Sequence, residues 1–394
     1  MKILFLTQRL PYAPNRGDRI RSYHLLRRLL PDAEVHLVSL VAADEVAHID
    51  SVRSWLPRVY VAKPRRLANL VRALFALFGD TPLTHALLDA PGLEQQLAEL
   101  HRREQFDLVL ACSSGMARFA VKGPLAVLPC VIDMVDVDSE KWKALSLRSS
   151  PPMSWIYRRE ARVLAYFEAE AARHARFTLV VSEREGQALR ALAPDAQVIV
   201  LSHGVDIEYF RPPVNSARGR NVVFTGIMDY APNVEAATWF SKEVWPLVRA
   251  RAPEAEFLIV GARPTAALRR LSEEAGVTVT GSVDDVRPYL WRSTVAIAPL
   301  FAARGQQNKV LEAVAAGLPI VTTPVVAEGL PACVLPACTV ISTPQEFVEA
   351  VVDLLESPDV ERQRRVARAD LSGFTCASQL QPLTDILKKA IEGP

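Results

Sequence analysis

The stretch between positions 299 and 321 holds the densest group of side chains that could bind an anion. It has the pattern of a buried strand, a loop, a helix that stops at Gly317 and a second buried strand. The free N–H groups and the dipole at the start of such a helix favour a diphosphate, and Arg304 and Lys309 add positive charge there. Glu312, in the first turns of the helix, could accept paired hydrogen bonds from a ribose diol. The alternative is an ordinary amphipathic helix with a turn before it.

A second group follows the first expected strand, where residues 9–21 open a helix. Arg16, Arg19 and Arg21 lie beside the start of that helix and could hold a phosphate on a lipid-linked acceptor. Helix capping and surface solvation would also account for them. The segment has no Gly-x-Gly-x-x-Gly pattern, so a nicotinamide cofactor is not expected.

A third group, Asp133, Asp136 and Asp138, lies just past another expected strand. Carboxylates in that position could bind an acceptor or take the proton from its hydroxyl. Their spacing also permits a metal ion, and helix capping is the third alternative.

Composition excludes several other classes of function. The net charge of +2, from 46 basic and 44 acidic residues, argues against a dedicated nucleic-acid-binding protein. Five scattered cysteines without a histidine cluster predict neither a disulfide framework nor a zinc site, but idle thiols in a reducing compartment. The first apolar run is too short for a signal peptide, and no run of about 18 apolar residues predicts a spanning helix. We therefore expect a cytoplasmic protein, with peripheral contact to a membrane as an open question.

That question concerns Lys63–Phe78, a basic and apolar stretch with a helical pattern. It could lie in a membrane interface, where basic residues attract anionic lipids. The alternative is a core helix with a basic edge.

Short apolar runs alternate with helical patterns along the whole chain, as in α/β proteins with doubly wound parallel sheets. The turn-rich segment 210–220 separates two such series and predicts an interdomain linker. The strands expected in the first series are Ile3–Leu6, Val35–Leu40, Val59–Ala62, Leu108–Ala111, Val131–Asp133, Thr178–Val181 and Val198–Leu201. Those expected in the second are Val222–Thr225, Phe257–Val260, Val277–Thr280, Val295–Ala298, Pro319–Thr322 and Thr339–Ser342. Ligands of such sheets bind at the carboxyl ends of the strands, so we expect the active site in a cleft shared by the two domains.

The stretch around Glu312 resembles the signature of the retaining glycosyltransferase family 4, which has the two-domain GT-B fold. That family carries two glutamates separated by seven residues, and the second is followed by Ala and a Gly-x-Pro turn. Glu312, Ala313 and the turn at 317–319 match this pattern, whereas Arg304 replaces the first glutamate. Residues 304–313 closely resemble a branch with an Arg-Gly-x-Gln-Asn-Lys-x-Leu-Glu-Ala pattern, the sugar transferases associated with bacterial exosortase and exopolysaccharide systems.

Other segments are similar to the same family. Residues 201–206 with 210–212 resemble the end of its first domain, with His203 in place of the usual asparagine. Residues 223–233 resemble the first loop of its donor domain, where Gly226 would let the backbone approach a phosphate. Residues 281–286 resemble the loop that contacts the nucleotide base, although a strand-to-helix turn capped by Asp would look the same.

The resemblance implies two Rossmann-like domains: 1–212 binds the acceptor and 213–375 binds the donor, while 376–394 forms a helix that packs back on the first domain. The implied catalytic residues are Asp136, Asp138, Arg304 and Glu312. The implied donor-binding residues are Gly226, Val283, Arg304, Gly305, Gln306, Gln307, Asn308, Lys309 and Glu312. The implied acceptor-binding residues are Arg16, Gly17, Asp18, Arg21, Asp133 and Asp136.

The expected reaction moves a sugar from a nucleoside-diphosphate sugar to a hydroxyl of a glycan or lipid-linked acceptor, with retention and with neither cofactor nor metal. Bacterial exopolysaccharide or other cell-surface glycan synthesis is the expected context. Two alternatives remain: a catalytically silent GT-B module that binds a nucleotide sugar or glycan, and a sugar epimerase of similar architecture.

Overall fold

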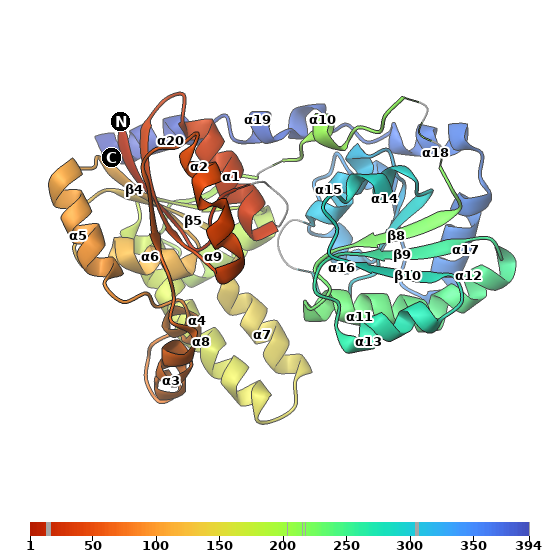
Figure 1. Cartoon of the computed structure of the whole chain (residues 1–394), viewed down its shortest axis with the longest axis horizontal. Coiled ribbons are helices and arrows are strands. Elements are labelled where there is room, and N and C mark those ends of the chain that lie inside the picture. The colour runs from red at the N-terminus through yellow and green to blue at the C-terminus, as the bar shows by residue number, and fades with distance from the viewer. Residues whose placement is uncertain (13–16, 203, 215, 217, 304–306, 394) are drawn as a thin grey trace. The chain divides into compact units, whose positions relative to one another are not determined.

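The structure is a computed structural model that describes residues 1–12, 17–202, 204–214, 216, 218–303 and 307–393. The chain divides into two compact units, each built on a parallel β-sheet covered by helices (Figure 1). Unit 1 comprises Met1–His203 and Gln379–Pro394, and unit 2 comprises Gly204–Ser378. Among the described helices, none is long and apolar enough to cross a membrane.

Unit 1 contains a seven-stranded sheet in the order β3-β2-β1-β4-β5-β6-β7. Its strands are β1 (Lys2–Thr7), β2 (Glu34–Leu40), β3 (Val59–Ala62), β4 (Leu108–Cys112), β5 (Cys130–Val135), β6 (Phe177–Val180) and β7 (Val198–Val200). Alternate side chains of β1 enter two separate cores, with Leu4 and Leu6 on one face of the sheet and Ile3 and Phe5 on the other. Because both faces are buried, such a strand is recognisable in the sequence as an unbroken apolar run.

The helices of unit 1 cover both faces of this sheet. They are α1 (Gly17–Leu29), α2 (Ile49–Arg53), α3 (Arg66–Ala76), α4 (Leu83–Leu87), α5 (Leu93–Glu104), α6 (Ser114–Val121), α7 (Asp138–Arg148), α8 (Met153–His174), α9 (Glu183–Leu192) and α20 (Leu383–Glu392), with the 3₁₀ helix η1 (Ala43–His48). Helix α20 returns from the far end of the chain to α1, and its Leu383, Ile386 and Leu387 complete the core on that face.

Unit 2 contains a six-stranded sheet in the order β10-β9-β8-β11-β12-β13. Its strands are β8 (Asn221–Thr225), β9 (Glu256–Val260), β10 (Val277–Gly281), β11 (Val295–Ala298), β12 (Ile320–Thr322) and β13 (Cys338–Val340). Its helices are α10 (Ile207–Phe210), α11 (Ala231–Trp239), the π-helical η2 (Phe240–Val244), α12 (Trp245–Arg251), α13 (Ala266–Arg270), α14 (Arg287–Trp291), α15 (Asn308–Ala315), α16 (Pro324–Ala327), α17 (Pro344–Glu356), α18 (Asp359–Val366) and α19 (Cys376–Gln379). Short 3₁₀ turns are η3 (Leu271–Glu273), η4 (Leu335–Ala337) and η5 (Ser372–Phe374).

The division between the units differs from the boundaries expected at 212/213 and 375/376. Residues before 213 already belong to unit 2, because Phe210 is buried in its core and accepts a hydrogen bond from Trp291 Nε1 at 2.8 Å. Val205 pairs with Thr375 in an isolated parallel bridge, which holds both ends of the segment 204–378 in the same unit.

Candidate active-site residues of the two units

Two glycines bring the carboxyl ends of β8 and β9 into close contact. The Gly226 N–H donates to the carbonyl of Val260 at 3.1 Å, and a Cβ at Gly261 would lie 1.6 Å from the Gly226 oxygen. Only a residue without a side chain fits at Gly261. The half-buried backbones of Gly226 and Gly261 thus meet at the carboxyl end of the unit 2 sheet, where α/β proteins bind their ligands.

Helix α15 sends a lysine to this edge. Lys309 Nζ donates to Asn233 Oδ1 at 2.6 Å and lies 4.6 Å from the centre of the Phe224 ring. A Cβ on Gly226 would come within 3.3 Å of the same ammonium nitrogen. Asn233 is itself fixed, because its Nδ2 donates to the carbonyl of Ile227 at 3.0 Å. The ammonium group is therefore held beside Gly226 by a partner that the sequence did not reveal.

Burial perturbs both charged groups of α15. Loss of water lowers the pKa of Lys309 to about 7, although the nearby Glu312 carboxylate opposes this change. Loss of water likewise raises the pKa of Glu312 to about 7, against the attraction of Lys309. Asn308 Oδ1, at the start of the helix, is buried and has no hydrogen-bond partner among the described residues. An anionic group of a ligand would compensate the desolvated Lys309 ammonium, and a hydroxyl or N–H donated by the ligand would satisfy the Asn308 Oδ1 acceptor.

The other donor-site residues expected from the sequence fall into two groups. Gln307 immediately precedes α15, and Val283 follows β10 and packs against the unit 2 core. Arg304, Gly305 and Gln306 lie outside the described residues.

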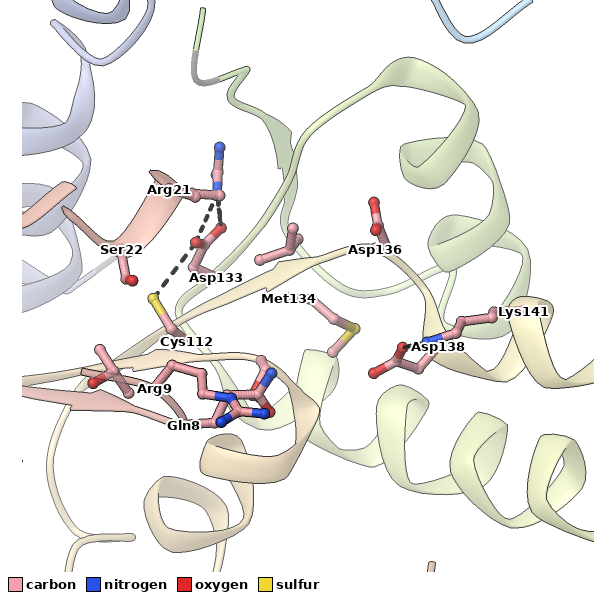
Figure 2. A pocket seen from close by; sticks show the side chains of 13 residues that line it. Gln8, Arg9, Arg21, Ser22, Cys112, Asp133, Met134, Asp136, Asp138 and Lys141 are labelled. Atoms are coloured by element: carbon pink, nitrogen blue, oxygen red, sulfur yellow. Dashed lines mark hydrogen bonds and ion pairs between the residues drawn. The ribbon is translucent and has the colours of Figure 1, made fainter. Parts of the chain in front are cut away.

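Unit 1 has a cavity of about 280 Å³ at the carboxyl ends of β1, β4 and β5 (Figure 2). It is lined by Thr7, Gln8, Arg9, Arg21, Ser22, Cys112, Ser113, Asp133, Met134, Val135, Asp136, Asp138 and Lys141. The structure therefore brings together four of the residues that sequence reasoning assigned to the acceptor or to catalysis: Arg21, Asp133, Asp136 and Asp138. These four side chains differ in their surroundings.

Arg21 and Asp133 are each other's partner. Arg21 Nε lies 2.9 and 2.7 Å from the two Asp133 oxygens, and Arg21 Nη2 lies 2.6 Å from Oδ1. Arg21 Nη1 donates to the carbonyl of Leu201 at 2.7 Å, and Cys112 Sγ lies 3.6 Å from Asp133 Oδ2. A buried, bidentate pair of this kind fixes the wall of the cavity and joins α1 to β5.

Asp136 has a different environment. Desolvation, together with the negative charges of Glu185 and Asp138, raises the pKa of Asp136 to about 7. Its Oδ1 atom is buried and has no hydrogen-bond partner among the described residues. The preceding Val135 has a φ of 67°, which is rare for a β-branched residue, and the register of β5 with β6 shifts there. This irregularity ends the strand and turns the chain into the loop that carries Asp136.

Two glutamates that the sequence did not single out hold this loop. Glu185 accepts from the Val137 N–H at 2.7 Å, and Glu168 accepts from the Ser139 N–H at 3.2 Å. They satisfy N–H groups at the start of α7 that a helix leaves unpaired. Asp138 lies 3.3 Å from Ser114 Oγ and 3.8 Å from Lys141 Nζ. Glu168 and Glu185 lie on helices with ordinary amphipathic patterns, so only their burial identifies them.

The arginine cluster near the start of α1 is partly structural. Arg19, like Arg21, is buried: it donates to Glu45 Oε1 from Nε at 2.9 Å and from Nη2 at 2.7 Å, and to the Tyr12 hydroxyl at 2.6 Å. Gly17 and Asp18 form the first turn of α1, and Arg16 lies outside the described residues.

In the part of the chain that the structure describes, one group of side chains has its potential metal-binding atoms within 4.8 Å of one another: Glu34, His36 and Glu104. It lies at the amino ends of β1 and β2, away from Asp133, Asp136 and Asp138. Lys2 Nζ is 3.4 Å from Glu34 and 3.0 Å from Glu104, so an ammonium already supplies the positive charge there.

Comparison with known proteins finds a family to which the segment around α15 is similar. Residues 219–357, within unit 2, match the sequence profile of the family described as glycosyl transferases group 1. None of the curated protein sequences matches the chain.

Three solved structures resemble the chain along nearly its whole length. Anabaena Alr3699/HepE in complex with UDP and glucose is 15% identical, with a TM-score of 0.68 over 98% of this chain and 99% of that one. Sucrose-phosphate synthase from Thermosynechococcus elongatus is 14% identical, with a TM-score of 0.68 over 98% of each chain. α,α-Trehalose 6-phosphate synthase from Burkholderia multivorans is 13% identical, with a TM-score of 0.63 over 98% of each chain. The protein therefore has the GT-B fold, and residues 219–357 of its second unit are similar to the group 1 glycosyltransferases.

Proposed function

We propose that the protein transfers a sugar, with retention, from a nucleoside-diphosphate sugar to a hydroxyl of a glycan or lipid-linked acceptor. The observation that carries this proposal is the half-buried Lys309, whose ammonium is held by Asn233 beside Gly226 at the carboxyl end of the unit 2 sheet. It lies inside the segment that matches the group 1 glycosyltransferases. Alr3699/HepE, which shares the fold, has been solved with UDP and with UDP-glucose.

Unit 2 binds the donor in this proposal. The diphosphate accepts hydrogen bonds from Lys309 and from the free N–H groups at the start of α15, where Gln307 and Asn308 lie. Its negative charge raises the pKa of Lys309 again, so that the lysine is fully protonated when it stabilises the departing diphosphate. Glu312 accepts from the ribose, Val283 contacts the base, and the segment 304–306 adds the charge of Arg304. No metal or cofactor has a part in this scheme.

Unit 1 supplies the acceptor site, which we assign to the cavity around Asp136. A carboxyl group with a pKa of about 7 is poised to take a proton from the acceptor hydroxyl at neutral pH. The protein contributes no covalent nucleophile: the hydroxyl attacks from the face that the diphosphate leaves, so the anomeric configuration is retained. Asp138 and Arg21, which line this cavity, contact the acceptor. Bacterial cell-surface glycan synthesis is the proposed context, and the five free cysteines fit a cytoplasmic location.

Mass spectrometry of nucleotide-sugar mixtures incubated with the protein tests this proposal. Release of nucleoside diphosphate, increased by a glycan acceptor, is the expected result. A converted sugar still attached to the nucleotide would identify an epimerase instead. A ligand that binds without any turnover would identify a silent module, the alternative suggested by Arg304 in place of the family's first glutamate.

The Asp136→Asn variant separates the roles of the two units. It removes the proton acceptor, and general-base groups contribute about 10²–10⁴ to a rate, so turnover falls while nucleotide binding is unchanged. The matched control is Asp195→Asn, which alters an exposed aspartate of the same unit. Equal turnover in the two variants would remove Asp136 from the mechanism.

A further inference from the structure

Helix α3 presents its apolar side chains outward. Six large apolar residues of the segment 67–78 have between 53% and 93% of their surface exposed: Leu67, Leu70, Val71, Leu74, Phe75 and Phe78. The spacing of three and four residues places them on one face of the helix. Contiguous apolar surface of this kind marks an interaction site, whereas single exposed apolar residues do not.

The opposite face of α3 attaches the helix to unit 1 through polar contacts. Asn69 is fully buried, and its Nδ2 donates to the carbonyls of Leu87 at 2.9 Å and Asp89 at 2.7 Å. Arg72 forms an ion pair with Asp89, and Arg159 of α8 donates to the carbonyls of Ala76 and Gly79. The body of the protein therefore contacts the face of α3 that carries Asn69 and Ala76, while the large apolar side chains point away from it. Figure 1 shows α3 beside α4 at the edge of unit 1. The alternative in which residues 63–78 form a core helix is wrong.

Basic residues flank the apolar face. Residues 63–79 contain no acidic side chain. Lys63, Arg65 and Arg66 are exposed at the start of α3 and form no ion pair with the described residues. Trp155 and Tyr166 are exposed on the face of α8 that also carries Arg159, the residue that contacts the end of α3. Apolar residues flanked by cations and aromatic side chains match the boundary between anionic headgroups and acyl chains.

We propose that this face of α3, with Lys63, Arg65 and Arg66, docks unit 1 on an anionic lipid bilayer. Charge favours the bilayer over a second copy of the chain, because two such faces would bring their cations together and residues 63–79 hold no acidic side chain to pair with them. The apolar side chains enter the headgroup region, and the cations pair with lipid phosphates. The proposal does not depend on the proposed glycosyl transfer.

Co-sedimentation with vesicles tests the docking without any assay of activity. Wild-type protein is expected to sediment with phosphatidylcholine vesicles containing about one-third phosphatidylglycerol, and much less with pure phosphatidylcholine. A triple variant, Lys63→Gln with Arg65→Gln and Arg66→Gln, is expected to bind on the order of 100-fold more weakly, since each cation near the surface contributes about fivefold. The Leu74→Glu, Phe78→Glu double variant is expected to stay in the supernatant.

The control is Val360→Glu, which changes an exposed valine of α18 in unit 2 and leaves vesicle binding as in the wild type. All variants alter exposed residues, so unchanged melting temperatures will show that they fold. The proposal is overturned if wild-type protein ignores anionic vesicles, or if the double variant still sediments with them. It is equally overturned if analytical ultracentrifugation shows a wild-type dimer that the double variant abolishes, because a second copy would then cover this face.

Discussion

Two glycines at the carboxyl edge of the unit 2 sheet differ in what a side chain would meet. A Cβ at Gly261 would lie 1.6 Å from the backbone oxygen of Gly226, which cannot move without breaking the sheet. A Cβ at Gly226 would meet only the ends of two side chains, Asn233 Nδ2 at 2.7 Å and Lys309 Nζ at 3.3 Å. One glycine is therefore required by the fold, and the other shapes the site.

The two alanine variants should separate these roles. Gly261→Ala is expected to lower the free energy of unfolding by several kcal/mol, because backbone must shift. Gly226→Ala is expected to fold, but to bind a nucleoside diphosphate about tenfold more weakly, because Lys309 is displaced from its charged hydrogen bond. Thermal unfolding and calorimetric titration measure the two effects. If Gly261→Ala has the same melting temperature as the wild type, the glycine is not required by the fold. If Gly226→Ala binds the nucleoside diphosphate as tightly as the wild type does, Gly226 does not shape the site.

Asp136 links pH to stability. Folding raises its pKa from 3.8 to about 7, so the folded protein holds this proton more tightly than the unfolded chain does. Its stabilising contribution is complete below the unfolded pKa and is lost as the pH rises to about 7, at no more than about 1.4 kcal/mol per pH unit. Asp136→Asn cannot ionise, so at pH values above about 7 it is expected to be more stable than the wild type by up to a few kcal/mol.

Chemical denaturation of both proteins at several pH values measures this difference. The gap between them should shrink as the pH falls toward the ordinary pKa of an aspartate. Asp195→Asn, an exposed substitution, should follow the wild type throughout. An Asp136→Asn protein less stable than the wild type above neutral pH would show that the ionised carboxylate is favoured in the folded state.

Among the elements, the strands were easier to predict from the sequence than the face with which a helix contacts the rest of the protein. The runs Val35–Leu40 and Leu108–Ala111 correspond to β2 (Glu34–Leu40) and β4 (Leu108–Cys112), because burial on both faces leaves an unbroken apolar signal. The pattern of Lys63–Phe78 predicted a helix but could not show which face meets the protein. The orientation of the helix depends on Asn69, which donates to the carbonyls of Leu87 and Asp89. These partners are 18 and 20 positions away in the sequence, so no local pattern reveals them.

Helix α20 is the element whose effect should extend furthest from its place in the sequence. Leu387 is fully buried in the unit 1 core, so Leu387→Ala is expected to cost about 2–5 kcal/mol and to speed hydrogen exchange in unit 1 alone. Leu354→Ala, at an equally buried position of α17, is expected to cost a similar free energy and to speed hydrogen exchange in unit 2 alone. Faster exchange confined to unit 2 in Leu387→Ala would contradict the assignment of α20 to unit 1.

At the scale of the whole molecule, the sequence predicted two parallel-sheet domains and the GT-B fold, and the structure has them. It also pointed to Lys309 and Asp136, because a cation near a helix start and a carboxylate after a strand have local signals. Asn233, Glu168 and Glu185 had none. Asn233 is 76 positions from Lys309, and Glu185 is 48 positions from Val137, so these partners are known only once the chain has folded.

We propose that unit 2 binds a nucleoside-diphosphate sugar at Lys309 and Glu312. The most direct test is thermal unfolding with UDP-, GDP-, ADP- and dTDP-sugars, for wild-type protein and for Lys309→Met, Glu312→Ala and the exposed control Lys242→Met. A ligand at about 100 times its dissociation constant adds about 2.7 kcal/mol, which is readily seen as a higher melting temperature. We predict that sugars of one base stabilise the wild type and Lys242→Met but neither site variant, and slow hydrogen exchange at residues 226–233 and 307–312. If no nucleotide sugar at millimolar concentration stabilises the wild type, or if all four proteins respond alike, the claim is contradicted.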